Sequence, residues 1–136
     1  MKILILDDDD MRHRRFAQWF AGYDCTHCFT YDQFAKAFGT GKFDYTFLDH
    51  DLNDNQYRSV KEIDGDNIPG YIGPCTKELT GQDAARLVAG DPERAGHVVI
   101  HSWNPYGARE MEKTLRDIPG GVTVWTFNPK EDLKLK

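Results

Sequence analysis

Residues 2–10 read KILILDDDD, an aliphatic run that ends in four consecutive acids. The run Lys2–Leu6 does not alternate polar and apolar residues, which is typical of a parallel strand buried on both faces. From Met11 the pattern becomes helical, and Gly22 supplies a stop signal. One face of this helix carries Phe16, Trp19 and Phe20. A buried strand followed directly by an amphipathic helix indicates an α/β protein with acids at the carboxyl end of its first strand.

The alternation of strand and helix continues along the chain. Further strands are expected at Tyr23–Phe29, Phe43–Leu48, Val98–Ile100 and Val122–Phe127. Helix start signals lie at Asp32, at the capping box of Thr80 and Asp83, and at Asn104–Pro105. Such strands run parallel with right-handed crossovers, and five of them most often take the flavodoxin-like order 2-1-3-4-5. Seven residues follow Pro129, so the last helix is expected to be short or absent.

Length and charge limit the possible partners. The chain has 136 residues and is 40% hydrophobic, so residues 1–136 are expected to form one domain. It carries 17 Lys and Arg against 22 Asp and Glu, a net charge of −5. Such a chain is a poor candidate for duplex nucleic acid, which is bound by lysine and arginine. A single nucleotide or an RNA end stays open, because a metal ion can supply positive charge.

A long irregular insertion interrupts the pattern at residues 53–79, where Pro69 and Pro74 break any regular element. Loops longer than about 15 residues are usually lids, binding loops or disordered segments. Because this one starts directly after Asp51 and the acids before it, a lid over the site is the preferred interpretation.

Cysteine usage and the absence of a targeting signal predict a reduced, cytoplasmic protein with no membrane partner. The aliphatic run that ends at Leu6 is too short for a signal peptide or a membrane span. Cys25 and Cys28 are spaced like zinc ligands, with His27 between them and Cys75 in the insertion. Paired zinc ligands need a turn between them, whereas these two lie within an expected strand. Plain packing is therefore preferred over a zinc site.

Carboxylates gather after the first and third expected strands. The candidate metal ligands are Asp7, Asp8, Asp9, Asp49 and Asp51. Two carboxylates 4 Å apart repel by about 4 kcal/mol at a protein surface, so several at the carboxyl ends of neighbouring strands favour a bound cation. Oxygen ligands with no cysteine nearby suit Mg²⁺ or Mn²⁺ better than zinc. The alternative for Asp9 and Asp10 is that they cap the following helix.

A second polar motif follows the fourth expected strand, where residues 101–107 read HSWNPYG. The helix that begins here offers free backbone N–H groups, so Ser102 and Asn104 are candidates for binding phosphate. His50 and His101 lie at neighbouring strand ends, and two imidazoles beside a metal suit proton transfer. The alternative is that Asn104 is an N-cap and His101 a satisfied core histidine.

These motifs resemble those of two-component receiver domains, and more closely those of the receiver-like family described as cyclic-phosphate processing. The resemblance rests on Leu6-Asp7-Asp8-Asp9, Leu48-Asp49-His50-Asp51-Leu52, Thr80-Gly81-x-Asp83 and His101-Ser102-x-Asn104-Pro105-x-Gly107. It spans nearly the whole chain, and the second and fourth segments are specific in combination. The chain departs from ordinary receivers at Asn128, where they have lysine before proline, and in its missing or stunted fifth helix.

The resemblance implies a metal-dependent phosphoesterase that hydrolyses a cyclic phosphate of a nucleotide or an RNA end. By position, the metal roles of a receiver fall on Asp7, Asp8 and Asp49. We expect His50 and His101 to divide the roles of general base and general acid. Phosphate oxygens would be held by Ser102 and Asn104, with Arg12 and Arg109 as candidate clamps.

Two other functions fit the same residues. One is a receiver-like module that binds a nucleotide or a protein without catalysis. The other is phosphotransfer to Asp49, the residue at the phosphoacceptor position. Asn128 argues against phosphotransfer, because it lacks the charge by which a receiver's lysine couples the phosphoryl group to the output face.

Overall fold

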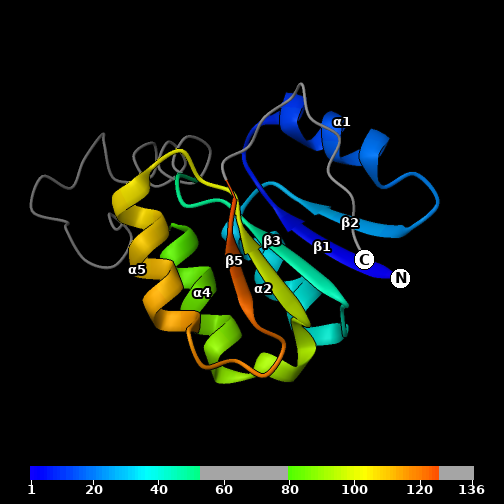
Figure 1. The fold of residues 1–136 in the computed structure, drawn as a ribbon. Helices are drawn as coiled ribbons and strands as arrows, with labels where there is room; N and C mark the ends of the chain where they lie inside the picture. Colours follow the sequence, from blue (N-terminus) through cyan, green and yellow to red (C-terminus); the bar gives the residue numbers. More distant parts are fainter. Residues whose placement is uncertain (53–79, 126–136) are drawn as a thin grey trace, which may run out of the picture.

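The computed structural model describes residues 1–52 and 80–125 of the chain. Strands and helices alternate through both segments, as the sequence pattern predicts (Figure 1). The expected insertion at 53–79 and the expected short or absent last helix fall outside the described residues. That residues 1–136 form one domain stays a prediction.

Five parallel strands form one sheet in the order β2-β1-β3-β4-β5, which confirms the predicted topology. They are β1 (Lys2–Leu6), β2 (Asp24–Cys28), β3 (Tyr45–Leu48), β4 (His97–Ile100) and β5 (Val122–Val124). The register pairs Leu6 with Leu48 and Leu48 with Ile100, so the carboxyl ends of β1, β3 and β4 are level. The residues that follow these three strands therefore meet at one edge of the sheet.

The helices begin at polar caps. They are α1 (Asp10–Trp19), α2 (Tyr31–Thr40), α4 (Gly81–Gly90) and α5 (Pro105–Leu115), and a 3₁₀ turn, η2, spans Pro92–Arg94. Thr80 and Asp83 form the predicted capping box of α4. The expected cap of α2 at Asp32 is wrong, because the helix starts at Tyr31 and its N-cap is Thr30, whose hydroxyl accepts the capping bond from the Gln33 N–H. None of the described helices is long and apolar enough to cross a membrane.

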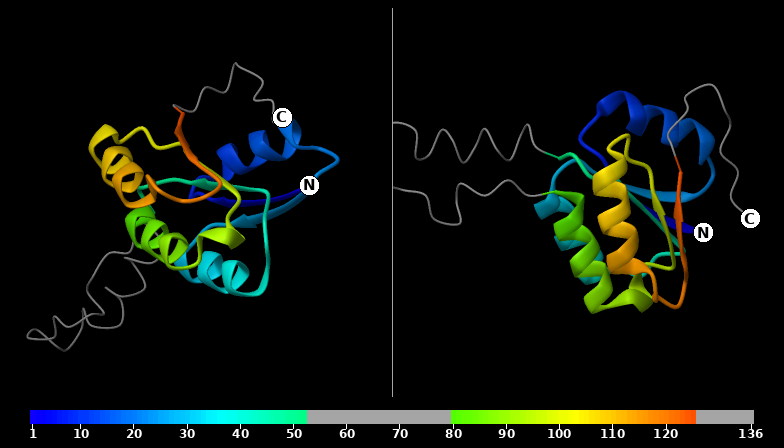
Figure 2. Two further views of the ribbon diagram at one scale, coloured as in Figure 1. Left: turned by 60° about the horizontal axis from the view of Figure 1, so that its bottom comes forward. Right: turned by 60° about the vertical axis from the view of Figure 1, so that its left-hand side comes forward.

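Helices cover both faces of the sheet. Among the described helices, α1 packs on one face and α2, α4 and α5 on the other (Figures 1 and 2). In β1, Ile3 and Ile5 face α1, whereas Leu4 and Leu6 join the core beneath the other three helices. All four side chains are fully buried, and for this reason residues 3–6 are all apolar.

The third strand is shorter than the expected Phe43–Leu48. Phe43 lies before β3, and its N–H donates to the carbonyl of Arg94 outside the sheet.

The two cysteines of β2 lie on opposite faces of the sheet. Cys28 packs in the core on the α2 side, whereas Cys25 packs on the α1 side. The zinc alternative for Cys25 and Cys28 is therefore wrong, because the two thiols lie on opposite faces of the sheet. Cys75 is outside the described residues.

A close approach of two backbones requires glycine at position 81. The Gly81 N–H donates to the His50 carbonyl at 2.7 Å. A Cβ on this residue would overlap the backbone carbonyl of Asp49. The N-terminus of α4 is therefore packed directly against the segment that carries Asp49 and His50.

Gly81→Ala is expected to destabilise the protein by about 1–3 kcal/mol, because the added methyl group must displace a backbone segment. Thermal melting followed by circular dichroism measures the effect. The matched control is Gly39→Ala in α2, where a Cβ meets nothing within 4 Å and helix propensity should add about 0.5–1 kcal/mol. An unchanged melting temperature in Gly81→Ala would contradict the close approach.

Candidate functional site

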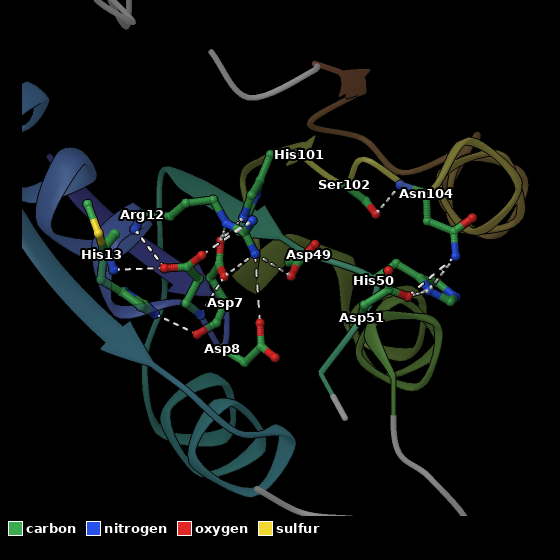
Figure 3. A network of polar contacts seen from close by, with 12 residues as sticks. Asp7, Asp8, Arg12, His13, Asp49, His50, Asp51, His101, Ser102 and Asn104 are labelled. Carbon is green, nitrogen blue, oxygen red and sulfur yellow. Dashed lines mark hydrogen bonds and ion pairs between the residues drawn. The ribbon is translucent and has the colours of Figure 1, made fainter. Parts of the chain in front are cut away.

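Three carboxylates form a compact cluster at the edge where β1 and β3 end. Asp7, Asp8 and Asp49 each place an oxygen within 4.8 Å of the other two. The Asp7 side chain is completely buried and that of Asp49 is 5% exposed. An all-oxygen donor set with two buried members fits a hard divalent cation. The sequence-based expectation for these three residues is consistent with this geometry (Figure 3).

Asp9 and Asp51, the other two candidate ligands, lie outside the cluster. The Asp9 carboxylate accepts from the N–H groups of Met11 and Arg12 and caps α1, so the capping alternative describes it. Asp51 accepts instead from the ring of His50. β3 ends at Leu48 and the chain bends at His50, so Asp51 does not return to the face that holds Asp49.

A cation of the protein itself lies among the three carboxylates. The Arg12 guanidinium donates from Nε to Asp7 at 2.6 Å and from Nη2 to Asp7 at 2.8 Å and Asp49 at 3.1 Å. It also lies 3.7 Å from Asp8. Arg12 is thus an internal counter-ion for the cluster, which corrects its predicted position on substrate phosphate.

The two buried carboxyls respond to this setting in opposite ways. Burial alone would raise the pKa of Asp7, but hydrogen bonds from His101 and Arg12 hold that pKa well below its usual range. Burial and the charge of Asp7 raise the pKa of Asp49 to about 8. The single arginine therefore leaves Asp49 without enough positive charge to ionise readily, and a second cation would relieve that deficit.

Arg12→Ala is expected to destabilise the metal-free protein by roughly 2–4 kcal/mol, because the buried Asp7 loses two hydrogen bonds from a guanidinium. Mg²⁺ should restore more stability to this variant than to wild type, since no internal cation competes. Melting curves with and without Mg²⁺ measure both effects.

The matched control is Arg14→Ala on the same helix, where an exposed pair with Asp10 at 3.0 Å is worth at most about 0.5 kcal/mol. If Arg12→Ala and Arg14→Ala melt alike without metal, Arg12 is not the counter-ion of the cluster.

His101 is buried on the α1 side of the sheet. Its Nε2 lies 2.9 Å from Asp7, both side chains are inaccessible to solvent, and the ring packs against Phe16. Its Nδ1 has no partner among the described residues. A buried ring cannot reach a substrate, so the predicted acid–base role of His101 is replaced by one in positioning Asp7.

His50 lies on the other side of the cluster, beside α5. Its Nδ1 lies 2.8 Å from the Asp51 carboxylate, and the amide of Asn104 donates to the same carboxylate at 3.3 Å. The ring packs against Gly107, where a Cβ would overlap it. Figure 3 shows the two histidines apart, with His50 beside Asp51 and Asn104 and His101 beside Asp7 and Arg12.

Strand alternation explains this separation. Val99 faces α1, so His101, two residues later, lies on the same side of the sheet. Asp49 likewise comes two residues after Phe47, which also faces α1. His50 comes two residues after Leu48, whose side chain belongs to the core on the opposite face. The period of two that separates the two histidines was available in the sequence.

The predicted phosphate-binding residues differ in their exposure to solvent. Asn104 is the N-cap of α5, with its side chain accepting from the Gly107 N–H at 3.0 Å. Ser102 is buried, and its hydroxyl accepts from the Asn104 N–H at 3.0 Å. Arg109 lines a groove on α5 that also reaches Ser102. Neither Ser102 nor Asn104 is placed as an exposed phosphate ligand, whereas Arg109 is exposed.

Sequence reasoning missed a second histidine pair beside the cluster. Nδ1 of His13 lies 2.7 Å from Nδ1 of His27, and His13 Nε2 is 2.7 Å from the Asp7 carbonyl. The carbonyl can only accept, so His13 donates from Nε2 and, when neutral, accepts from His27. Burial lowers the pKa of both rings, which favours this neutral arrangement. The available signal was that His13 lies three residues before Phe16, on the buried face of α1.

Comparison with solved structures identifies the fold. The chain matches a response regulator from Burkholderia pseudomallei, solved with a phosphorylated aspartate, a calcium ion and citrate, at 16% identity and a TM-score of 0.60. The match covers 95% of this chain and 62% of that one. A Thermotoga maritima response regulator in complex with Mg²⁺-BeF matches with 16% identity and a TM-score of 0.60, over 95% and 90% of the two chains.

A CheY-like receiver protein from Methanospirillum hungatei gives 15% identity and a TM-score of 0.59, covering 95% of this chain and 84% of the other. Comparison with curated protein sequences gives no significant match. At these identities the likeness is one of fold, the five-stranded parallel sheet of receiver domains. Residues 2–117 match the profile of the cyclic-phosphate processing receiver domain, and the chain belongs to that family.

Proposed function

We propose that this protein is a metal-dependent phosphoesterase that opens a cyclic phosphate ester of a nucleotide or an RNA end. The observation that carries the proposal is the His50–Asp51 pair beside the acidic cluster. The Asp51 carboxylate only accepts, so His50 donates from Nδ1 and its Nε2 bears the lone pair. A carboxylate that fixes this tautomer also stabilises the imidazolium formed on proton uptake. A module that only binds has no need of such a base.

Asp7, Asp8 and Asp49 would hold Mg²⁺ or Mn²⁺. The support for this assignment is the donor set of three carboxylates, together with the raised pKa of Asp49, which favours exchange of a proton for a cation. Bound there, the metal would supply positive charge at a phosphate oxygen.

The remaining roles belong to side chains of this chain. His50 takes a proton from water at Nε2 as the water oxygen bonds to phosphorus. One ester bond of the ring breaks, and the leaving alkoxide takes a proton from solvent, so the product is a phosphate monoester. His101 holds Asp7 in place, and Arg12 balances the charge of the cluster when the cation leaves.

The test is a panel of 2′,3′-cyclic, 3′,5′-cyclic and cyclic-dinucleotide substrates, each incubated with Mg²⁺ and with Mn²⁺. We expect conversion of at least one cyclic ester to a monoester, with loss of activity in EDTA. Metal-dependent binding of these compounds without turnover would assign the chain to the non-enzymatic alternative.

A parallel incubation with acetyl phosphate and Mg²⁺ tests phosphotransfer. Intact mass is expected to show no stable phosphoryl group on the protein. A mass gain that disappears in Asp49→Ala would make the chain a phosphoacceptor and overturn the proposal. The residue that argues against phosphotransfer in the sequence, Asn128, lies outside the described residues.

A further inference from the structure

An open groove lies between α5 and β5. Its volume is about 520 Å³, within the range of pockets that hold small organic ligands. Ser102 is one of its lining residues, Ala108 and Val124 contribute apolar surface, and Arg109 and Glu112 of α5 add polar groups. None of these side chains is used by the chemistry proposed above.

The exposed indole of Trp103 joins this groove to the cluster. Trp103 lines the groove and is 64% exposed, although large aromatic side chains are usually covered. The guanidinium of Arg12, which bonds to Asp7 and Asp49, lies 5.7 Å from the centre of the indole. A ligand whose phosphate is at the cluster would therefore have the groove beside it.

The chemistry of the groove suits a nucleobase. An exposed indole offers a flat surface on which any base can stack. Arg109 can donate hydrogen bonds to a base edge and Glu112 can accept them. Glu112 and the net charge of −5 disfavour a second phosphate or a longer polyanion in the same place. The groove therefore fits one base better than an RNA strand.

We infer that this groove binds the base of a mononucleotide whose phosphate occupies the acidic cluster. The inference rests on the proposed function and deepens it, because it names the substrate class as a nucleoside cyclic phosphate. Trp103 is assigned as the stacking surface, and Arg109 as a contact to the base edge.

The experiment is calorimetric binding in Mg²⁺ to adenosine 2′- and 3′-monophosphate, the two products of opening a 2′,3′-cyclic ring. The same phosphates of methyl riboside, which lack a base, are the reference ligands. We expect the base to tighten binding at least tenfold in wild type and Trp103→Ala to remove that gain. Binding of the base-free phosphates should not change.

Two matched variants on the same helix are the controls. Tyr106→Ala removes an aromatic ring that is 72% exposed and does not line the groove, so it should leave binding unchanged. Arg109→Gln should weaken nucleotide binding, whereas Lys113→Gln, which removes a charge paired with Glu110, should not.

The inference is overturned if the base-free phosphates bind as tightly as the nucleotides, if Trp103→Ala and Tyr106→Ala behave alike, or if neither nucleotide binds. An oligonucleotide with a 2′,3′-cyclic end that binds more tightly than the mononucleotides would also overturn it, in favour of an RNA end. Trp103-dependent binding without hydrolysis of any cyclic ester would support the groove and refute the proposed function. Hydrolysis of a cyclic ester with an unchanged KM in Trp103→Ala would support the proposed function and refute the groove.

Discussion

Replacing Asp49 by asparagine is expected to abolish binding of Mg²⁺ and Mn²⁺ while making the metal-free protein more stable. The variant loses one of the three clustered carboxylates. Its metal affinity should fall by more than the roughly 10–100-fold that loss of a supporting contact around a metal ligand costs. Isothermal titration with each ion measures this loss.

The stability change has a defined pH dependence. Folding raises the pKa of Asp49 from 3.8 to about 8, so the folded protein binds more protons than the unfolded chain between these values. Metal-free wild type should therefore lose stability as pH rises from about 4 to about 8, and Asp49→Asn should escape this loss. The gap in free energy of unfolding should reach on the order of 2–4 kcal/mol near pH 8.

Asp51→Asn is the matched control, because the two aspartates are neighbours in sequence but Asp51 lies outside the cluster. It should bind metal as wild type does. If Mg²⁺ raises the melting temperature of Asp49→Asn as much as that of wild type, the assigned metal site is wrong. If Asp51→Asn loses metal binding, Asp51 is a metal ligand after all.

His50→Gln is expected to lower kcat by about 10²–10⁴-fold, the usual contribution of a general base. Metal affinity and melting temperature should change little, because carboxylates hold the ion and the side chain is partly exposed. Steady-state rates on the best cyclic substrate across pH 5–9 measure this.

Asp51→Asn also tests the catalytic role of the His50–Asp51 pair. The amide no longer fixes the His50 tautomer, so kcat should fall while KM and metal affinity stay near wild type. An unfolded His50→Gln protein, or one that loses metal and activity together, would require withdrawal of the general-base assignment. His101→Gln is expected instead to weaken metal binding, because that ring contacts Asp7.

Much of the fold could be predicted from local patterns. Residues 3–6 are uniformly apolar because both sheet faces are covered, and the capping box at Thr80 marks the start of α4. The order of the strands was predicted because five parallel strands joined by helices most often take the flavodoxin-like order. The cap of α2 was placed wrongly because Thr30 and Asp32 are both good capping residues, and only the backbone shows where the helix starts.

The sequence by itself determined that Asp7, Asp8 and Asp49 would meet, because level parallel strands end at one edge of the sheet. The tertiary structure decided what surrounds them. Arg12 extends from α1 into the cluster because a buried group of carboxylates is costly without a cation. His101 is buried against Phe16 because the alternation of β4 continues one residue beyond its end, whereas the chain after β3 bends at His50, which pairs with Asp51. The contacts of Arg12 with Asp49 and of His101 with Asp7 join residues far apart in the chain, so only the tertiary structure brings these side chains together.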